Sequence, residues 1–396
     1  MAATAVRCGG GGARGTRGRR AFPVAPAHPG SGCQVPRSGQ VPTGRAVTIS
    51  DVEFFLVEIG CEGRRRPVRS LLVRLATDAG LEGWGEAHVK WRCSELAARR
   101  ELLLPTLGGR SVFDVEELLM LEALKTAPLR AAVEMACWDL VGKATGQPLC
   151  CLFGGSFRSR VPMAVRLFGD SVDQTAGLAR ELADQGFHSQ IVPVRGSLGE
   201  DLDLMCALEE AGRDRIEFQV DAAGLYDVDS ARELCFGLEQ TSHLQFILDP
   251  LGPGQLDQIA SLRRQTSVPL AVRRSVQHLS DVMTLLRCQA AQYLVVDLER
   301  VGGMARARQC AWVAHAGDIP SSLGGGPWLG PGLVAVLQLA ASTPAFSRCN
   351  ECARPALEDD LLAEPLEIAD GMVSVPQGPG LGIEVDRAKV EQYQMP

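Results

Sequence analysis

The amino-acid sequence predicts an α/β protein built around a (β/α) barrel. After Pro148, short apolar runs such as "IEFQVDAAG", "LQFILDP" and "AQYLVVDLE" alternate with helical segments of about a dozen residues, roughly seven times. Such alternation is typical of parallel βαβ units, and this number of units favours closure of the sheet into a barrel. Before Pro148 the pattern differs, since residues 47–87 contain two strand-like runs joined by a Gly-containing turn, and helical patterning follows. The sequence therefore predicts an α+β region followed by the barrel.

The start of the chain has a different composition. The first fifty residues carry seven arginines and no Asp or Glu, and they are rich in Gly and Pro. Such a segment buries too little apolar surface to fold, so we expect residues 1–45 to form a disordered Gly/Arg/Pro-rich extension. An organelle-import signal and a misassigned start site are alternative interpretations of this Arg-rich stretch.

The composition of the 396-residue chain argues against several classes of protein. Its 46% hydrophobic and 22% charged residues are typical of a globular protein, and the length allows two domains or one large barrel with an added module. The net charge of -7 and the lack of a basic stripe argue against nucleic-acid binding. No apolar run approaches the roughly 20 residues needed to cross a bilayer. The 13 cysteines are odd in number and scattered, which favours reduced thiols in a cytoplasmic protein.

Charged residues end four consecutive strand-like runs of the predicted barrel. Asp221, Asp249 and Asp297 end three of these runs, and the adjacent Arg273 and Arg274 end the fourth. In such barrels the chemistry lies at the carboxyl ends of the strands, so we expect these side chains to converge on one mouth. Successive side chains of a strand point to opposite faces, so one of the two arginines should point inward. A buried guanidinium there needs a carboxylate or phosphate partner.

Several stretches resemble a known family. Residues 71–87, "LLVRLATDAGLEGWGEA", and 131–155, "AAVEMACWDLVGKATGQPLCCLFGG", resemble the capping-domain signatures of the enolase superfamily, in the branch of mandelate racemase and muconate-lactonizing enzymes. "VVDLERVGGM" and the tail "PLEIADGMVSVPQGPGLGIEVD" are similar to the same family. The resemblance implies an α/β fold with a (β/α)7β TIM-like barrel over residues 151–360. An N-terminal α+β capping domain, residues 46–150, would be completed by the C-terminal segment 361–396.

Members of this family abstract a proton α to a carboxylate and hold the resulting enediolate on Mg²⁺. An α-proton is too weakly acidic for an ordinary base, so the metal takes up the charge that develops on the carboxylate oxygens. The resemblance implies three carboxylate ligands, at the ends of barrel strands three, four and five. It also implies bases, which are either lysines on strands two and six or a His–Asp pair from strands seven and six.

Carboxylates occupy only part of the family's metal-ligand positions. The first position matches Asp221, and the second falls on Leu248, with Asp249 as its acidic neighbour. The third falls on Arg273 or Arg274, and an arginine there would repel a divalent cation. The sequence therefore predicts an incomplete metal site at Asp221 and Asp249, with an arginine as an internal cation or anion-binding group. Arg274 is the preferred candidate because it matches the ligand position of the His–Asp branch, and we expect its guanidinium about 2.7–3.2 Å from Asp221.

The base positions of the family are substituted as well. The strand-two lysines fall on Ile191 and Pro193, and the strand-seven histidine falls on Ser322. An unactivated serine hydroxyl is no base near neutral pH, and the other two side chains cannot accept a proton. Asp297 matches the aspartate of the His–Asp pair, which places the chain nearer the mandelate racemase branch. Glu351 matches a strand-eight carboxylate, and we interpret both acids as vestigial catalytic residues.

These observations leave three functions open. The first is a catalytically degenerate homologue of Mg²⁺-dependent sugar-acid racemases and dehydratases, which needs no cofactor. The second is an active racemase or dehydratase that binds Mg²⁺ in a rebuilt site. The third is a metal-independent protein that binds a small carboxylate or another anion through Arg273 or Arg274. The family resemblance also implies a homo-oligomer.

Overall fold

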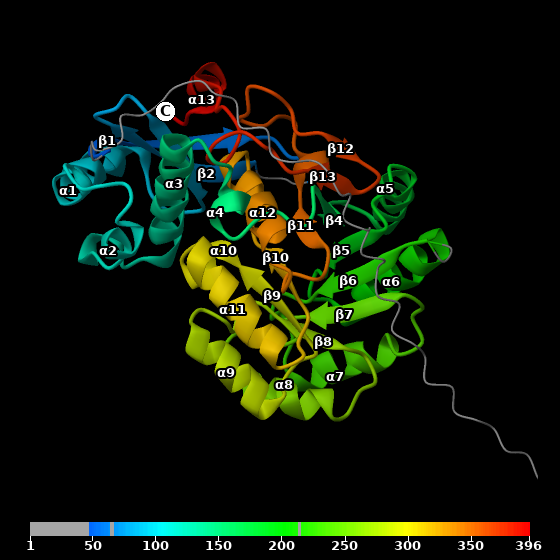
Figure 1. Ribbon diagram of the computed structural model, residues 1–396. Helices are drawn as coiled ribbons and strands as arrows, with labels where there is room; N and C mark the ends of the chain where they lie inside the picture. The colour runs from blue at the N-terminus through cyan, green and yellow to red at the C-terminus, as the bar shows by residue number, and fades with distance from the viewer. Residues whose placement is uncertain (1–46, 64–66, 213–214) are drawn as a thin grey trace, which may run out of the picture. The chain divides into compact units, whose positions relative to one another are not determined.

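The structure, a computed structural model, describes residues 47–63, 67–212 and 215–396 (Figure 1). The extension predicted for residues 1–45 lies outside the described residues. The described chain contains an antiparallel sheet with its own helices, followed by a barrel of parallel strands. None of the helices in these ranges is long and apolar enough to span a membrane.

The N-terminal region is a three-stranded antiparallel sheet covered by helices. Its strands pair in the order β1–β2–β3, and alternate residues of β1, such as Val52, Phe54 and Leu56, pack into one apolar cluster with the helices. The next residue along, Val57, contributes to a second cluster on the opposite face. The strands are β1 (Ile49–Ile59), β2 (Val68–Thr77) and β3 (Glu82–Ala87), and the helices are α1 (Leu96–Leu107), α2 (Val115–Leu119), α3 (Ala127–Thr145) and α4 (Leu149–Leu152).

Helix α3 lies close against β3 because two glycines of the "GWGEA" segment leave room for it. A Cβ atom on Gly85 would lie 1.9 Å from the carbonyl oxygen of Ala132, and one on Gly83 would lie 2.2 Å from that of Ala136. Any larger residue at either position would push the helix away from the sheet. The helix ends at Gly146, whose φ of 67° is a left-handed conformation that glycine adopts without steric penalty.

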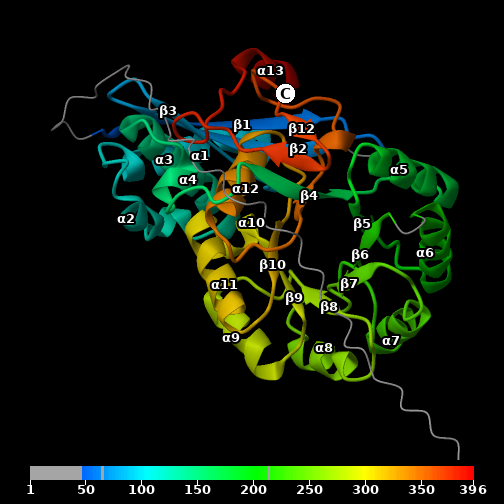
Figure 2. The same ribbon diagram turned by 45° about the vertical axis from the view of Figure 1, so that its right-hand side comes forward.

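Eight parallel strands of the described chain form the barrel, as the sequence predicts (Figure 2). From β4 to β10 each strand pairs with the next one in chain order, and the last strand, β11, pairs with the first, β4. Two hydrogen bonds join the β10 and β11 regions, from Arg348 N to Ser321 O (3.2 Å) and from Leu323 N to Asn350 Oδ1 (2.8 Å). The strands are β4 (Arg160–Arg166), β5 (Ser189–Pro193), β6 (Glu217–Asp221), β7 (Leu244–Leu248), β8 (Leu270–Val272), β9 (Tyr293–Asp297), β10 (Ser321–Gly324) and β11 (Asn350–Cys352).

Helices follow the first seven strands in turn, which gives the (β/α)7β order. Side chains cap the starts of several of them: Ser171 accepts a hydrogen bond from the backbone of residue 174, Asp227 accepts one from residue 230, and Asp297 accepts from residues 299 and 300. The helices are α5 (Val172–Asp184), α6 (Leu198–Gly212), α7 (Val228–Gly237), α8 (Leu256–Arg263), α9 (Leu279–Cys288), α10 (Leu298–Val301), α11 (Met304–Ala316) and α12 (Pro331–Ser342).

The barrel strands bury different residues on their two faces. Outward residues such as Val220 and Val296 pack with the helices in the main hydrophobic core. Four inward side chains, from Phe246, Leu248, Ala271 and Val295, form a separate small cluster inside the barrel. Because side chains alternate along a strand, the next inward positions after Ala271 and Val295 are residues 273 and 297, at the carboxyl ends.

The C-terminal segment contacts both parts of the structure. The hairpin of β12 (Ile368–Ala369) and β13 (Met372–Ser374) pairs antiparallel with the start of β4. The final helix α13 (Arg387–Tyr393) leads back to the N-terminal sheet, where Met395 N donates to Leu56 O at 2.8 Å. The segment thus pairs with the start of the first barrel strand before it reaches β1.

We predict that Gly85→Ala lowers the free energy of unfolding by about 1–3 kcal/mol, because the added methyl group clashes with the α3 backbone. Gly177→Ala is the matched control. Gly177 lies inside α5, and an added Cβ meets nothing within 4 Å, so this change should stabilise the protein by about 0.5–1 kcal/mol. Urea unfolding of both variants measures the two effects. Equal effects of the two substitutions would contradict the close α3–β3 contact.

Candidate functional site

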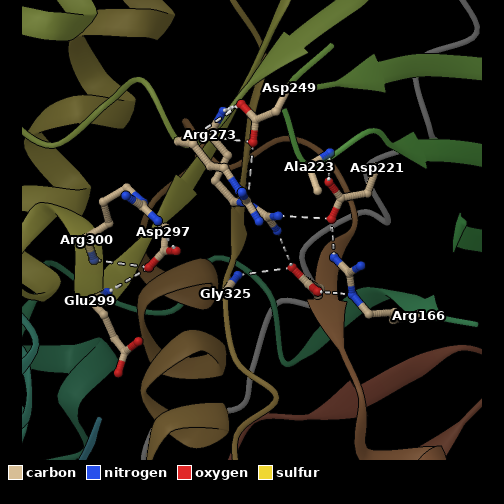
Figure 3. A network of polar contacts seen from close by, with 11 residues as sticks. Arg166, Asp221, Ala223, Asp249, Arg273, Asp297, Glu299, Arg300 and Gly325 are labelled. Carbon is tan, nitrogen blue, oxygen red and sulfur yellow. Dashed lines mark hydrogen bonds and ion pairs between the residues drawn. The ribbon is translucent and has the colours of Figure 1, made fainter. Parts of the chain in front are cut away.

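Two arginines and two carboxylates fill the mouth of the barrel (Figure 3). Arg273 Nη2 lies 2.9 Å from Asp221 Oδ2, and Arg273 Nη1 lies 3.2 Å from Glu351 Oε2. Arg166 contacts the same two acids from the other side, with Nη2 at 2.6 Å from Asp221 Oδ2 and Nε at 2.7 Å from Glu351 Oε1. We call Arg166, Asp221, Arg273 and Glu351 the quartet. Each guanidinium thus bridges the two carboxylates.

Strand alternation places the quartet on four different strands. Asp221 ends β6, Arg166 ends β4, Glu351 lies in β11, and Arg273 directly follows β8. The quartet is largely shielded from water, since the side chains of Asp221 and Arg273 expose only 4% and 9% of their surface. Gly324 of β10 leaves space beside it, because a Cβ there would lie 3.2 Å from Glu351 Oε2.

The two guanidiniums determine the ionisation of Asp221. Burial alone would raise the pKa of this carboxyl group, but the charges of Arg166 and Arg273 outweigh burial and lower its pKa to about 2. Burial also disfavours the charged form of Arg273, yet Asp221 and Glu351 raise the pKa of Arg273 overall. Asp221 and Arg273 are therefore both ionised at neutral pH, and the quartet pairs two guanidinium groups with two carboxyl groups.

The prediction that Arg274 is the internal cation is wrong. Arg273, and not Arg274, pairs with Asp221, and the 2.9 Å distance falls in the expected range. The reason is the strand alternation: Ala271 belongs to the inward cluster, so the side chain two residues later also points inward. Arg274 is half-buried, and its backbone N–H donates to Asp249 Oδ1 at 3.1 Å.

Asp249 holds the backbone of the arginine pair. Its Oδ1 accepts hydrogen bonds from the backbone N–H groups of Arg273 (2.7 Å) and Arg274 (3.1 Å), and its Oδ2 lies 3.8 Å from Arg273 Nε. The residue has a φ of 48°, and burial raises the pKa of its carboxyl group. Asp249 therefore positions Arg273. The carboxylate oxygens of Asp249 face the backbone at the carboxyl end of β8.

The side chain of Asp297 caps the start of a helix. Its Oδ1 accepts hydrogen bonds from the backbone N–H groups of Glu299 and Arg300, each at 3.1 Å, and so caps α10. Burial and the neighbouring Glu299 raise the pKa of Asp297. Ser322, at the family's histidine position on β10, is buried.

The remaining substituted positions bring apolar side chains to the same mouth. Pro193 and Leu248 lie beside Asp221 in the strand registers of β5 and β7, and Ile191 lies beside Arg166. Ile191 and Leu248 are buried. The positions predicted for the strand-two bases and for the second metal ligand thus carry side chains that neither accept a proton nor coordinate a cation.

The residues of this mouth do not fit Mg²⁺. Magnesium requires about six oxygen ligands in near-octahedral geometry. Of the three ligand positions, only Asp221 supplies a carboxylate, and both arginines already bind its Oδ2, while its Oδ1 accepts a hydrogen bond from Ala223 N at 3.1 Å. Within the described ranges, no cluster of three or more His, Cys, Asp or Glu side chains is arranged to hold a metal.

The sequence analysis missed Arg166. The signal was present, because "RVPMAVR" is the first strand-like run of the barrel and Arg166 is its last residue. Val161, Met163 and Val165 pack in the outer core, so alternation turns residue 166 inward. Examination of the end of this strand, together with those of strands three to six, would have predicted a second internal cation.

Two family models match the chain. The model described as "Enolase C-terminal domain-like" matches residues 174–389, and the one described as "Mandelate racemase / muconate lactonizing enzyme, N-terminal domain" matches residues 57–154. Among solved structures, an isomerase from Streptomyces coelicolor A3(2) is similar with a TM-score of 0.77 and 27% identity, covering 88% of this chain and 99% of that one. The 2-chloromuconate cycloisomerase from Rhodococcus opacus 1CP shares the fold, with a TM-score of 0.81 and 23% identity over 89% of this chain and 100% of that one.

Sequence relatives cover most of the chain. A chloromuconate cycloisomerase from Cupriavidus pinatubonensis is 28% identical over 338 residues, which are 82% of this chain and 91% of that protein. The N-succinylamino acid racemase from Thermus thermophilus is 30% identical over 342 residues, which are 82% of this chain and 89% of that protein. The family models and these relatives agree with the capping sheet and barrel described above. The chain belongs to the mandelate racemase/muconate lactonizing enzyme family of the enolase superfamily.

Proposed function

We propose that this protein is a non-catalytic member of its family, which does not bind Mg²⁺ in the barrel mouth and does not abstract protons α to carboxylates. The observation that carries the proposal is the position of Arg273, whose guanidinium bridges Asp221 and Glu351 at the third metal-ligand position. The barrel would then act as a folded scaffold for binding or structural roles.

Electrostatics supports a mouth without a metal. A unit charge and Mg²⁺ about 4 Å apart interact by roughly 8 kcal/mol at an effective dielectric constant of about 20. The repulsion between one guanidinium and Mg²⁺ therefore cancels the attraction between one carboxylate and Mg²⁺ at a similar distance. In the quartet two guanidiniums face two carboxylates, so no net attraction for a divalent cation remains there. Expelling Arg273 to admit a metal would also break a buried ion network, which costs about 3–5 kcal/mol.

The lack of bases at the family positions supports the same conclusion. Ile191, Pro193 and Ser322 stand where the family has lysines or a histidine. A general base contributes about 10²–10⁴-fold to a proton-transfer rate, and a serine without an activating partner does not replace it at neutral pH. The reactions named for the relatives, cycloisomerisation and racemisation, would need such a group in this mouth.

Anion binding at the quartet has less support. Arg273 directs both terminal nitrogens to carboxylates, and Arg166 directs Nε and Nη2 to the same acids. A carboxylate ligand would have to compete with Asp221 and Glu351 for these donors. Its entry would also add negative charge beside Asp249 and Asp297, which already have raised pKa values.

We predict no enzyme-dependent exchange of α-protons in a panel of α-hydroxy acids and sugar acids. The protein is incubated with each acid in D₂O with added Mg²⁺, and the α-proton signal is followed by NMR. Loss of the family bases should reduce exchange to the rate seen with heat-denatured protein. Faster exchange with the native protein, for any acid of the panel, would contradict the proposal.

We predict that Arg273→Leu lowers the free energy of unfolding at pH 7 by about 3–5 kcal/mol, because it leaves a buried carboxylate without one of its partners. Arg274→Leu is the control, since Arg274 is half-buried and outside the quartet, and it should change stability by only about 0.5 kcal/mol. Chemical denaturation gives both values. Equal losses in the two variants would argue against an energetic role for the quartet.

The stability loss caused by Arg273→Leu should also depend on pH in acidic solution. The pKa of Asp221 is lowered from 3.8 to about 2 in the folded protein, so its ionised form stabilises the fold above about pH 4. This contribution is lost as the pH falls through about 2. In Arg273→Leu the pKa of Asp221 rises and the contribution shrinks, so the stability gap to the wild type should narrow between pH 4 and pH 2. A gap that is independent of pH would contradict the pairing.

A further inference from the structure

A histidine of the N-terminal sheet region reaches the barrel mouth. His88 directly follows β3, and its Nδ1 lies 3.1 Å from Glu299 Oε1, while its backbone N–H donates to the same oxygen. Its Nε2 lies 2.9 Å from the carbonyl oxygen of Pro327, in the loop after β10. The ring also lies against Trp328, with 5.1 Å between ring centroids. One side chain thus contacts two segments that are far apart from each other and from β3 in the sequence.

The contacts of His88 require a proton on both ring nitrogens. A carboxylate and a backbone carbonyl only accept hydrogen bonds, and each faces a different nitrogen of the ring. A neutral imidazole has one N–H group, so it would direct a lone pair at one of the two acceptors. Only the imidazolium form donates to both Glu299 and Pro327.

The groups around His88 favour the charged form. Glu299 faces it from α10, and Glu86 of β3 lies nearby, where it accepts hydrogen bonds from Ser70 Oγ and from the backbone N–H groups of residues 329, 330 and 332. Ser70 Oγ of β2 lies 3.4 Å from His88 Nε2. Burial would lower the pKa of His88, but Glu299, Glu86 and the Pro327 carbonyl outweigh burial and raise it to about 9.

We propose that protonated His88 is a positioning residue that fixes α10 and the loop after β10 against the N-terminal sheet, and that this link opens when the imidazole loses a proton. Glu299 lies two residues after Asp297, the cap of α10 at the mouth, and its carboxylate points away from the quartet (Figure 3). The link therefore acts on α10, whose start lies at the rim of the mouth. It does not depend on whether the mouth is catalytic.

The direction of the pH effect follows from the two pKa values. The folded pKa of His88, about 9, lies above the ordinary value of 6.5, so the link contributes its full stability below about pH 6.5. The contribution falls as the pH rises above that value and is lost once the pH passes about 9. The link is therefore closed at neutral pH and opens only in alkaline solution.

Long-range ¹H–¹⁵N NMR of the histidine rings tests the protonation directly. We expect one ring to remain doubly protonated at pH 7.5 in the full-length protein, and its signal to be missing in His88→Gln. His188→Gln, at an exposed position, is the matched control and should leave that signal in place. A His88 ring that is neutral at pH 7.5 would overturn the proposal.

Hydrogen exchange tests the positioning role. We expect amides of residues 298–301 and 325–332 to exchange roughly tenfold faster in His88→Gln than in the wild type at pH 7, and to be unchanged in His188→Gln. If His88→Gln does not fold, Glu299→Gln provides the test, because it keeps an acceptor and removes the charge. It should lower the His88 pKa and speed exchange in the same segments. Unchanged titration or unchanged exchange in the folded variants would overturn the link.

Discussion

Charge neutralisation inside the barrel is the constraint on which the mouth of this protein depends. Asp221 and Glu351 lie close together in a site that is shielded from water, where two carboxylates without a cation would repel one another and take up protons. Arg166 and Arg273 supply the missing positive charge through four hydrogen bonds at 2.6–3.2 Å. Guanidinium groups remain charged at any ordinary pH, so the two carboxyl groups of the quartet have cationic partners without a bound ion.

The surrounding structure serves to hold this arrangement. The apolar cluster of Phe246, Leu248, Ala271 and Val295 fills the barrel below the quartet, and Asp249 binds the backbone at Arg273. The N-terminal sheet is fixed to the same mouth through His88, Glu299 and the loop after β10. The capping sheet and the (β/α)7β barrel of the family are therefore retained.

Much of the fold could be predicted from the sequence, because it depends on local patterns. Alternating apolar runs and helical segments predicted the barrel, and the strand ends located Asp221 and Asp297 at one mouth, whereas Glu351 was assigned only from the family resemblance. The choice between Arg273 and Arg274 was wrong because it relied on family position, although strand alternation decides it. The His88–Glu299 contact joins residues 211 positions apart, and no local pattern in the sequence indicates such a pairing.

Calorimetric titration with Mg²⁺ tests the central claim most directly. The wild-type protein should take up no magnesium in the micromolar range. The double variant Leu248→Glu/Arg273→Glu should gain binding, because it restores carboxylates on β7 and at the end of β8 beside Asp221. Leu248→Gln/Arg273→Gln removes the same side chains without adding charge and should bind no more than the wild type. Micromolar binding by the wild type that is lost in Asp221→Asn would contradict a mouth neutralised by its own arginines.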